Sequence, residues 1–374
     1  MGSHSTPAEL VFWIAVWVPL YAFLGYPLVL LALRVAIRRQ VRKASIHPLV
    51  SLLIPAYNEA RIIARKIENS KALHYPADRI EIVIVSDGST DQTVDIARSA
   101  GGVRVLALQR NHGKVFALNA AVPSLRGQIV VFSDASGMLA ADAVRRLIEN
   151  FGDPSVGAAS GRYRVVKANE VNIGASEDLY WKYEAFLKTQ ESLLASTLGA
   201  HGHLHAIRKH LYPFPPAETI NDDYVIPLSV VGRGFRAVYE PAAVVFEEAR
   251  EMTGFGRRIR IVAGNLQQLR YLRQFLKPYQ PLPLLFFLSH KVVRLFVPFA
   301  MLTALAANFW LIGSQPYRGI FGVQVAFYAL AALGLTGRLR PRALRLPFYF
   351  CMVNSAAFLG LYHAMTGRRS MAWK

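Results

Sequence analysis

Acidic and hydroxyl side chains of this chain follow short apolar runs, at positions where strands would end. The clearest case is IVVFSDASG at residues 129–137, in which Asp134 and Ser136 follow a β-type run. Ligands of open α/β sheets bind just outside the carboxyl ends of the strands, and hard divalent cations prefer oxygen ligands. We therefore expect Asp134 to hold a cation that neutralises phosphates. A Ser-Asp turn after a strand is also a common structural cap, so the motif alone leaves that role open.

Other polar stretches have similar positions. PAYNE at 55–59 follows the first apolar run and SDGS at 86–89 follows the second. Lys114 stands near the start of a predicted helix, where its cation can meet a phosphate, and NDD at 221–223 opens another helix. Each stretch alone is compatible with a turn or a helix cap. Their shared position at strand and helix ends predicts one ligand site.

Strand-like and helix-like segments alternate from residue 47 to residue 151. Apolar runs predict four strands, at 49–55, 79–85, 103–108 and 129–132. The intervening segments predict helices, at 59–73, from Ser89 to about residue 100, at 114–122 and at 141–151. Asn58 is expected to cap the first of these, and Ser89 with Gln92 to form a capping box. Such alternation is typical of βαβ units, and so of a mostly parallel α/β sheet.

The pattern after residue 156 is mixed. Short strands are expected at 156–163 and 236–239, with a polar helix at 176–194 between them. Residues 256–275 are basic and amphipathic, with apolar residues at helical spacing, which predicts a helix in the membrane interface.

Both ends of the chain are hydrophobic. Residues 10–33 form an uncharged stretch of 24 residues, long enough to span a membrane, and the basic run at 34–43 follows it. The positive-inside rule then places the run and the central domain in the cytoplasm. Three more hydrophobic segments lie at 293–312, 320–335 and 346–365. Basic residues flank the last segment on both sides, so either one tail lies on the unfavoured side or a segment is re-entrant.

Charge and cysteine content narrow the class of protein. The formal net charge is +19, but the basic clusters adjoin hydrophobic segments, which favours a membrane protein over a nucleic-acid binder. The single cysteine, Cys351, rules out a disulfide framework within the chain and suits a reducing compartment. We expect four parts: an N-terminal transmembrane helix with its basic flank at 1–45, a cytoplasmic domain at 46–250, interfacial helices at 251–290 and a C-terminal transmembrane region at 291–374.

Taken together, PAYNE, VSDGSTDQT, GKVFALNAA and FSDASG resemble the family-two inverting glycosyltransferases of the GT-A fold, in particular the membrane-embedded bacterial members that build exopolysaccharides. The resemblance spans residues 50–264. It implies a Rossmann-like cytoplasmic domain at the bacterial inner membrane that transfers a sugar, with inversion, from a nucleotide-sugar (a UDP-sugar is favoured) to a saccharide or lipid-linked acceptor. Membrane lipids and polysaccharide-export proteins are the other expected partners, and no nucleic acid.

Two alternatives stay open. One is a polyprenyl-phosphate sugar synthase, whose acceptor is a lipid phosphate. The other is a catalytically silent nucleotide-binding scaffold of a polysaccharide export complex. Donor turnover separates the enzymes from the scaffold. A dehydrogenase is excluded because PAYNE, and no Gly-x-Gly-x-x-Gly, follows the first strand.

The resemblance implies roles for particular residues. The nucleotide would be bound by Pro55, Ala56, Tyr57, Glu59, Asp87, Lys114 and Asp134. Asp134 would be the first member of the DxD motif for Mg²⁺ or Mn²⁺, and Ser136 at the second position predicts a weaker or water-bridged metal site. Asp223 would be the general base, because an inverting displacement needs a carboxylate to take the acceptor proton. Asp222 would lie on the acceptor side.

The sequence also departs from the family pattern. Arg257-x-x-Arg260-Ile261 stands where processive members carry Gln-x-x-Arg-Trp, with Gly264 in register. Both arginines are expected near the diphosphate. Ile261 has no aromatic face on which an acceptor sugar could stack, so we expect transfer of a single sugar rather than processive extension.

The segment GAHGHLHAIR at 199–208 resembles the acceptor-side loop of the family. We expect His201 and His203 to contact the acceptor, with zinc binding or plain packing as alternatives. Tyr180 and Trp181 either form a sugar platform or belong to an ordinary amphipathic helix.

Overall fold

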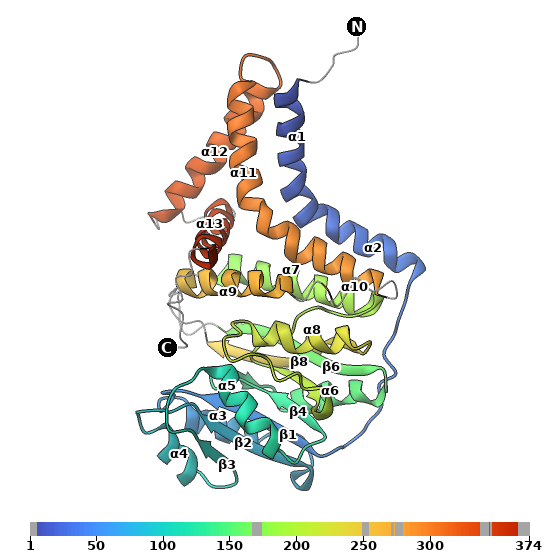
Figure 1. Ribbon diagram of the computed structural model, residues 1–374, viewed down its shortest axis with the longest axis vertical. Helices are drawn as coiled ribbons and strands as arrows, with labels where there is room; N and C mark the ends of the chain where they lie inside the picture. Colours follow the sequence, from blue (N-terminus) through green and yellow to red (C-terminus); the bar gives the residue numbers. More distant parts are fainter. Residues whose placement is uncertain are drawn as a thin grey trace.

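The computed structural model describes residues 6–166, 174–248, 254–270, 273, 280–336, 344 and 346–365. Figure 1 shows an α/β domain at one end of the molecule and long helices at the other. The strands are β1 (Val50–Ala56), β2 (Ile80–Ser86), β3 (Arg104–Ala107), β4 (Ile129–Phe132), β5 (Met138–Leu139), β6 (Val156–Val166), β7 (His205–Arg208) and β8 (Arg236–Glu248).

The helices of the α/β domain are α3 (Ile63–Lys71), α4 (Thr93–Ser99), α5 (Lys114–Ala121), α6 (Ala143–Ile148), α7 (Gly174–Leu194) and α8 (Asp222–Gly232). The remaining α-helices are α1 (Pro7–Leu20), α2 (Tyr26–Ala36), α9 (Gly254–Gln268), α10 (Pro281–Phe286), α11 (Val293–Trp310), α12 (Tyr317–Leu335) and α13 (Leu346–Met365). Two π-helical segments, η1 (Tyr21–Gly25) and η7 (Phe287–Val292), join α1 to α2 and α10 to α11.

The eight strands form one mixed sheet in the order β3-β2-β1-β4-β7-β6-β8-β5. β3, β2, β1 and β4 are parallel to their neighbours, as the alternation of strands and helices predicts. β7 is antiparallel to β4 and β6, whereas β6 and β8 are parallel. The carboxyl ends of the first four strands therefore lie at one edge of the sheet, and the polar stretches that follow them come together there.

Helices cover both faces of this sheet. Every residue of β1 is buried, as in strands enclosed on both sides. Successive side chains of a strand point to opposite faces. Leu53 accordingly joins the core cluster of Leu118 on α5, whereas Ile54 joins that of Ile67 on α3. This two-sided core gives the edge of the sheet a rigid support.

Two helix starts near the predicted site differ from the prediction. α3 begins at Ile63, and Asn58, which has a φ of +53°, accepts a hydrogen bond at Oδ1 from the Thr90 N–H (2.8 Å). α4 begins at Thr93, and Ser89 Oγ accepts a hydrogen bond from the Asn58 N–H (3.1 Å). The predicted helix cap at Asn58 and the capping box at Ser89 are wrong because these side chains bind the neighbouring loop instead.

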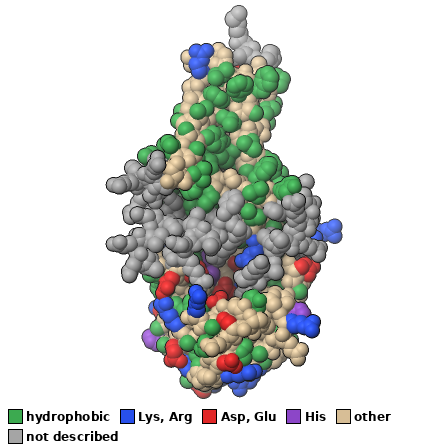
Figure 2. All heavy atoms as spheres, turned by 90° about the vertical axis from the view of Figure 1, so that its left-hand side faces the viewer, with side chains coloured by type: hydrophobic (Ala, Val, Ile, Leu, Met, Phe, Trp, Pro, Cys, Tyr) green, Lys and Arg blue, Asp and Glu red, His purple; other side chains and the backbone are tan. Residues whose placement is uncertain are grey.

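Three helical stretches in the described part of the chain are long and apolar enough to cross a membrane: Pro7–Ala36, Pro281–Trp310 and Tyr317–Leu335. The second begins earlier than the predicted segment at 293–312, because α10 and η7 continue directly into α11. Figure 2 shows hydrophobic side chains over the tall helical part, and charged side chains gathered on the domain beneath it.

The first of these stretches bends at η1. α1 packs along α11, whereas α2 turns across α7 (Figure 1). Tyr26 and Leu30 of α2 have no exposed surface and join the core of the α/β domain. The N-terminal hydrophobic segment therefore also fastens the domain to the tall helices.

The last hydrophobic segment lies against the amphipathic helix. α13 packs on α9, where a Cβ at Gly360 would lie 2.8 Å from the Val262 Cβ. In Figure 1 α13 is seen nearly end-on, whereas α11 and α12 run along the long axis of the molecule. This placement favours the alternative in which the segment does not cross the membrane as its neighbours do.

Candidate active site

The loops after β1 and β2 are hydrogen-bonded to each other. The Asn58 N–H donates to Ser89 Oγ (3.1 Å), and the Glu59 N–H donates to Thr93 Oγ1 (2.8 Å). Pro55 and Ala56, two of the predicted nucleotide-binding residues, are buried at the end of β1, and Tyr57 and Glu59 are half-buried. The side chains of one loop thus fix the backbone of the other.

Asp87 fixes the third loop of this edge. Its carboxylate has no exposed surface and accepts hydrogen bonds from the backbone N–H groups of His112 (2.9 Å) and Gly113 (2.7 Å). The next residue, Gly88, has a φ of +67°, and a Cβ there would lie 2.3 Å from the carbonyl carbon of Arg110. Only glycine permits this close approach. We call the three joined loops, at 55–59, 86–93 and 110–113, the strand rim.

Lys114 follows the strand rim and meets two carboxylates. Its Nζ lies 2.8 Å from Asp134 Oδ1, after β4, and 3.1 Å from Asp222 Oδ2, at the start of α8. Burial alone would lower the pKa of Lys114, but the two carboxylates raise it above its ordinary value. Burial would likewise raise the pKa of Asp134, but the Lys114 ammonium lowers it. Both groups are therefore charged near neutral pH.

Asp223 lies beside this ion pair. A Cβ at Gly202 would lie 3.2 Å from Asp134 Oδ2, 3.6 Å from Asp223 Oδ2 and 3.7 Å from Lys114 Nζ, so these groups surround one small residue. Burial and the neighbouring Asp222 carboxylate raise the pKa of Asp223. A carboxylate with a raised pKa is a better proton acceptor. We call Lys114, Asp134, Asp222 and Asp223 the acid cluster.

Ser136, at the second position of the predicted metal motif, has neighbours that the sequence does not reveal. Ser136 Oγ donates a hydrogen bond to Glu247 Oε1 (3.0 Å) and lies 3.4 Å from His203 Nε2. The Nδ1 atom of His203 lies 3.7 Å from Asp134 Oδ2. Glu247 belongs to no motif, since it is one of two consecutive glutamates at the end of the long strand β8, and sequence analysis missed it.

These residues fit a divalent cation that is held only in part by the protein. Asp134 Oδ1 is buried and has no hydrogen-bond partner besides the Lys114 ammonium. Within the described ranges, no group of three or more His, Cys, Asp or Glu side chains is arranged to hold a metal ion. A cation at Asp134 and Ser136 would therefore need oxygen ligands from a bound substrate or from water, as the loss of the second aspartate predicts.

The three histidines of the 199–208 segment have different surroundings. His203 lies beside the acid cluster, whereas the ring of His201 stacks on Tyr163 (centroids 4.3 Å apart) and adjoins Trp181 (4.7 Å). His205 stacks on Phe132, and burial lowers its pKa to about 4. The three imidazoles do not converge on one point, which argues against the zinc alternative.

Lys66 supports the loop that carries Asp134. It is fully buried, and its Nζ donates hydrogen bonds to Ser133 Oγ (2.6 Å) and to the Gly137 carbonyl. Sequence analysis did not single it out. Its spacing with the buried Ile63 and Ser70 on α3 was the available signal, because residues three and four apart share one helix face.

The helix with the altered arginine motif reaches the start of α8. The Asn221 side-chain amide donates to the Ile261 carbonyl (3.0 Å) and to Asn265 Oδ1 (3.2 Å). Gly264 permits this contact, because a Cβ there would lie 2.5 Å from the Asn221 side chain. Arg260 is half-buried near this contact, whereas the side chain of Arg257 lies outside the described residues.

The comparison with solved structures identifies the fold. The chain is similar to mannosyltransferase PcManGT from Pyrobaculum calidifontis, a structure determined in complex with GDP-Man and Mn²⁺. The TM-score is 0.76 at 24% sequence identity, and the match covers 96% of this chain and 100% of that one. The mixed, mostly parallel sheet is therefore of the GT-A type, which confirms the predicted fold class.

The sequence comparisons agree with the motifs. Residues 51–213 match the family model "Glycosyl transferase family 2", the family that the motifs resemble. The poly-beta-1,6-N-acetyl-D-glucosamine synthase of Staphylococcus aureus (strain COL) is 27% identical over 236 residues, which are 60% of this chain and 56% of that protein.

A second relative extends this picture. The probable glycosyltransferase YdaM of Bacillus subtilis (strain 168) is 27% identical over 250 residues, which are 62% of this chain and 58% of that protein. The chain thus spans just over half the length of the curated relatives that it matches.

Proposed function

We propose that this protein is a glycosyltransferase that moves a sugar from a nucleotide-sugar, with a UDP-sugar favoured, to a saccharide or lipid-linked acceptor with inversion. The acid cluster carries this proposal. It places Asp223, a carboxylate with a raised pKa, beside the Lys114–Asp134 ion pair at the carboxyl ends of the parallel strands. The similarity to a poly-beta-1,6-N-acetyl-D-glucosamine synthase and to a probable glycosyltransferase supports sugar transfer into a polysaccharide.

The strand rim would bind the nucleotide. Its backbone is held rigid by Asp87 and by the contacts between the 55–59 and 86–93 loops. Pro55, Ala56, Tyr57 and Glu59 would line the nucleoside, and Lys114 would meet the diphosphate. Arg260 would approach the same phosphates from α9.

Asp134 and Ser136 would hold Mg²⁺ or Mn²⁺ against the donor phosphates. The presence of Mn²⁺ in the structure of the mannosyltransferase relative supports this assignment. When bound, such an ion stabilises the negative charge that develops on the departing nucleoside diphosphate. Lys114 supplies a second positive charge at the same place, since its Nζ lies 2.8 Å from Asp134 Oδ1.

Asp223 would act as the general base. Its carboxylate takes the proton of the acceptor hydroxyl while the acceptor oxygen attacks the anomeric carbon, opposite the departing diphosphate. Asp222 keeps the pKa of this base raised and holds Lys114. Asp222, His201 and His203 would form the acceptor side. Ile261 is 40% exposed and aliphatic, so the site has no aromatic platform at this position and a single transfer is favoured.

The three candidate membrane spans support a membrane location. We place the protein in a bacterial inner membrane with the catalytic domain, residues 46–250, in the cytoplasm. The interfacial part at 251–290 and the membrane part at 291–374 would hold the acceptor side at the bilayer. Membrane lipids and polysaccharide-export proteins would be its other partners.

The test uses the full chain in detergent with Mg²⁺ or Mn²⁺ and a panel of UDP- and GDP-sugars, with released nucleoside diphosphate as the readout. One donor should be turned over, and Asp223→Asn should reduce turnover roughly 10²–10⁴-fold, the range for a lost general base. Nucleotide affinity should be unchanged. Asp142→Asn is the matched control, since Asp142 directly precedes α6 and pairs with Arg146 away from the acid cluster.

Each outcome decides between the alternatives. A fully active Asp223→Asn variant would reject Asp223 as the base. Binding of nucleotide without turnover of any donor, with or without membrane lipid extract, would favour the silent scaffold.

A further inference from the structure

A second buried polar region lies on the membrane side of α8, between α7 and η7. Its acidic side chains are already paired. Glu184 binds Arg294 through Oε1 and His290 Nε2 through Oε2 (3.2 Å). Glu191 binds His290 Nδ1 (2.7 Å) and accepts a hydrogen bond from the Tyr26 hydroxyl (2.7 Å). Through these contacts both carboxylates pair with Arg294, His290 or Tyr26.

Two lysines of the same region have no such partner. Lys188 on α7 is 8% exposed, and its Nζ donates only to the Ala200 carbonyl (2.9 Å). Lys291 on η7 places its Nζ 5.0 Å from the centre of the Tyr224 ring. Neither makes an ion pair with a carboxylate within the described part of the chain. Burial lowers the pKa of Lys188, the charge of Lys291 lowers it further, and the nearby Glu184, Asp223 and Glu191 carboxylates oppose this by raising it. We call Lys188 and Lys291 the lysine pair.

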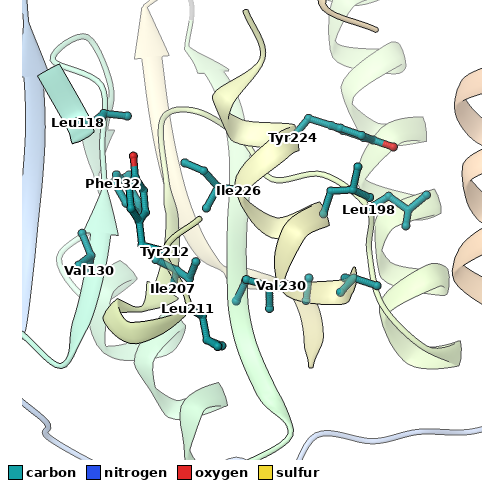
Figure 3. Close-up of a cluster of buried hydrophobic side chains, with 14 of the residues drawn as sticks. Leu118, Val130, Phe132, Leu198, Ile207, Leu211, Tyr212, Tyr224, Ile226 and Val230 are labelled. Atoms are coloured by element: carbon teal, nitrogen blue, oxygen red, sulfur yellow. The ribbon is translucent and has the colours of Figure 1, made fainter. Parts of the chain in front are cut away.

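Tyr224 adds an unpaired hydroxyl to this region. Its side chain is 4% exposed, and its hydroxyl has no hydrogen-bond partner among the described residues. Figure 3 shows the ring extending from α8 away from Phe132 and Tyr212, with the oxygen at its far end. A buried hydroxyl without a partner is unfavourable unless a ligand satisfies it.

This region adjoins the proposed base. Tyr224 follows Asp223 directly in the chain, and the Ala200 N–H donates to the Asp223 carbonyl (2.7 Å) while Lys188 binds the Ala200 carbonyl. An anion between the lysine pair would therefore lie close to the place where the acceptor hydroxyl must lose its proton.

We propose that Lys188, Lys291 and Tyr224 bind a phosphate group of a lipid-linked acceptor and hold it beside Asp223. Two ammonium groups and a hydroxyl are suitable donors for phosphate oxygens. The proposal rests on the proposed function, and it specifies the acceptor class.

The lipid origin of this phosphate follows from where the lysine pair lies. Lys291 belongs to the candidate span Pro281–Trp310, and Lys188 lies on α7, over which α2 passes. Above Lys291, α11 exposes Phe296 (58%) and Leu302 (56%), which offer an apolar path for a hydrocarbon chain. A free phosphate would not need such a path.

The test measures binding without donor, so it does not depend on turnover. The full chain in detergent is titrated with undecaprenyl phosphate, undecaprenol or inorganic phosphate. Undecaprenyl phosphate should bind, and undecaprenol should bind at least roughly tenfold more weakly, since charge-assisted hydrogen bonds are lost. Lys188→Gln and Lys291→Gln should each weaken binding of the lipid phosphate roughly tenfold, and Tyr224→Phe about threefold.

Matched variants separate charge from folding. Lys291→Arg keeps the charge and should retain most of the affinity, and Lys71→Gln, which removes a surface lysine paired with Glu68, should change nothing. Where a glutamine variant fails to fold, Lys291→Arg and Tyr224→Phe still test the site, because both keep the bulk of the side chain.

The outcomes are decisive in both directions. Equal binding of undecaprenol, or lysine variants with unchanged affinity, would overturn the proposal. Inorganic phosphate that competes with the lipid phosphate at similar concentration would show a phosphate site with no lipid selectivity, and would also overturn it. Donor turnover is a separate measurement, so failure of the proposed function would show there and not in the lipid titration.

Discussion

The strand rim and the acid cluster lie at the same edge of the sheet but differ in how their polar side chains are satisfied. In the strand rim, the oxygens of Asn58 and Asp87 accept hydrogen bonds from backbone N–H groups of neighbouring loops. In the acid cluster, Asp134 Oδ1 and Asp222 Oδ2 are buried with no hydrogen-bond partner besides the Lys114 ammonium.

This difference indicates two kinds of task. Backbone groups fixed by buried carboxylates form a rigid surface that a ligand meets without rearrangement, which lowers the entropy lost on binding. Charges that are incompletely paired are suited to partners that arrive with the substrate, such as phosphates, a cation or a transferable proton. The strand rim is therefore expected to determine stability, and the acid cluster to determine chemistry.

Among the predictions, replacement of Lys114 should have the largest effect on stability and on donor turnover. Lys114→Met leaves Asp134 and Asp222 buried without their cation, which costs about 3–5 kcal/mol for a buried pair that loses one partner. We expect donor turnover to fall roughly 100-fold or more, as for the loss of a charge that stabilises the leaving group. Turnover and thermal unfolding measure the two effects.

A cation titration sharpens this test. Mn²⁺ should raise the melting temperature of Lys114→Met more than that of the unmodified protein, because the ammonium no longer competes for Asp134. Lys71→Gln is the control, since that lysine lies on the surface beside Glu68. Equal stabilisation of both proteins by Mn²⁺ would show that Asp134 does not face a cation site.

Replacement of Asp87 tests the expectation that the strand rim determines stability. Asp87→Ala removes two hydrogen bonds from backbone amides to a buried carboxylate. Each is worth about 1.5–3 kcal/mol, so unfolding should become easier by roughly 3 kcal/mol or more, with nucleotide affinity reduced as a consequence. Asp87→Asn, which keeps one acceptor oxygen, should lose about half as much. Normal stability with lost nucleotide binding would mean that the carboxylate serves the ligand rather than the loop.

The sequence allowed much of the strand rim to be predicted. The apolar runs predict the four parallel strands. The positions of the polar stretches directly after these runs predict that they gather at one edge of the sheet. The roles of individual polar side chains were harder to predict, because Asn58 and Ser89 had local partners available yet bind across loops. A helix cap and a loop-to-loop contact use the same residue types, and only the folded arrangement distinguishes them.

The acid cluster depends more on contacts that are distant in sequence. Asp134 and Asp223 were identified by motif, but Glu247 reaches Ser136 only because β8 pairs with β6 and β5 far along the chain. The lysine pair depends on the return of η7 to α7, which no spacing in the sequence reveals. Lys66 is an intermediate case, since its helical spacing from Ile63 and Ser70 indicates its burial but not its hydrogen-bond partners.

Lys66, which supports the loop that carries Asp134, predicts a dependence of stability on pH. Burial lowers its pKa to about 7, so between pH 7 and its ordinary value near 10.5 the unfolded chain binds a proton that the folded protein lacks. The contribution of Lys66 to stability should therefore fall as the pH falls from 10.5 to 7. Thermal unfolding across this range should show a smaller slope for Lys66→Met than for the unmodified protein. Identical slopes would mean that Lys66 keeps its proton when folded.

The smallest expected effect concerns the base itself. The Asp222 carboxylate raises the pKa of Asp223, so Asp222→Asn should lower that pKa both by removing a negative charge and by releasing Lys114. Activity needs Asp223 unprotonated, so the acid limb of the turnover–pH profile should move to lower pH, by about one unit or less. Glu68→Gln, an exposed acid paired with Lys71, should leave the limb in place. A limb that moves to higher pH, or stays fixed while turnover falls, would assign the titrating group to another residue and leave Asp222 with only its contact to Lys114.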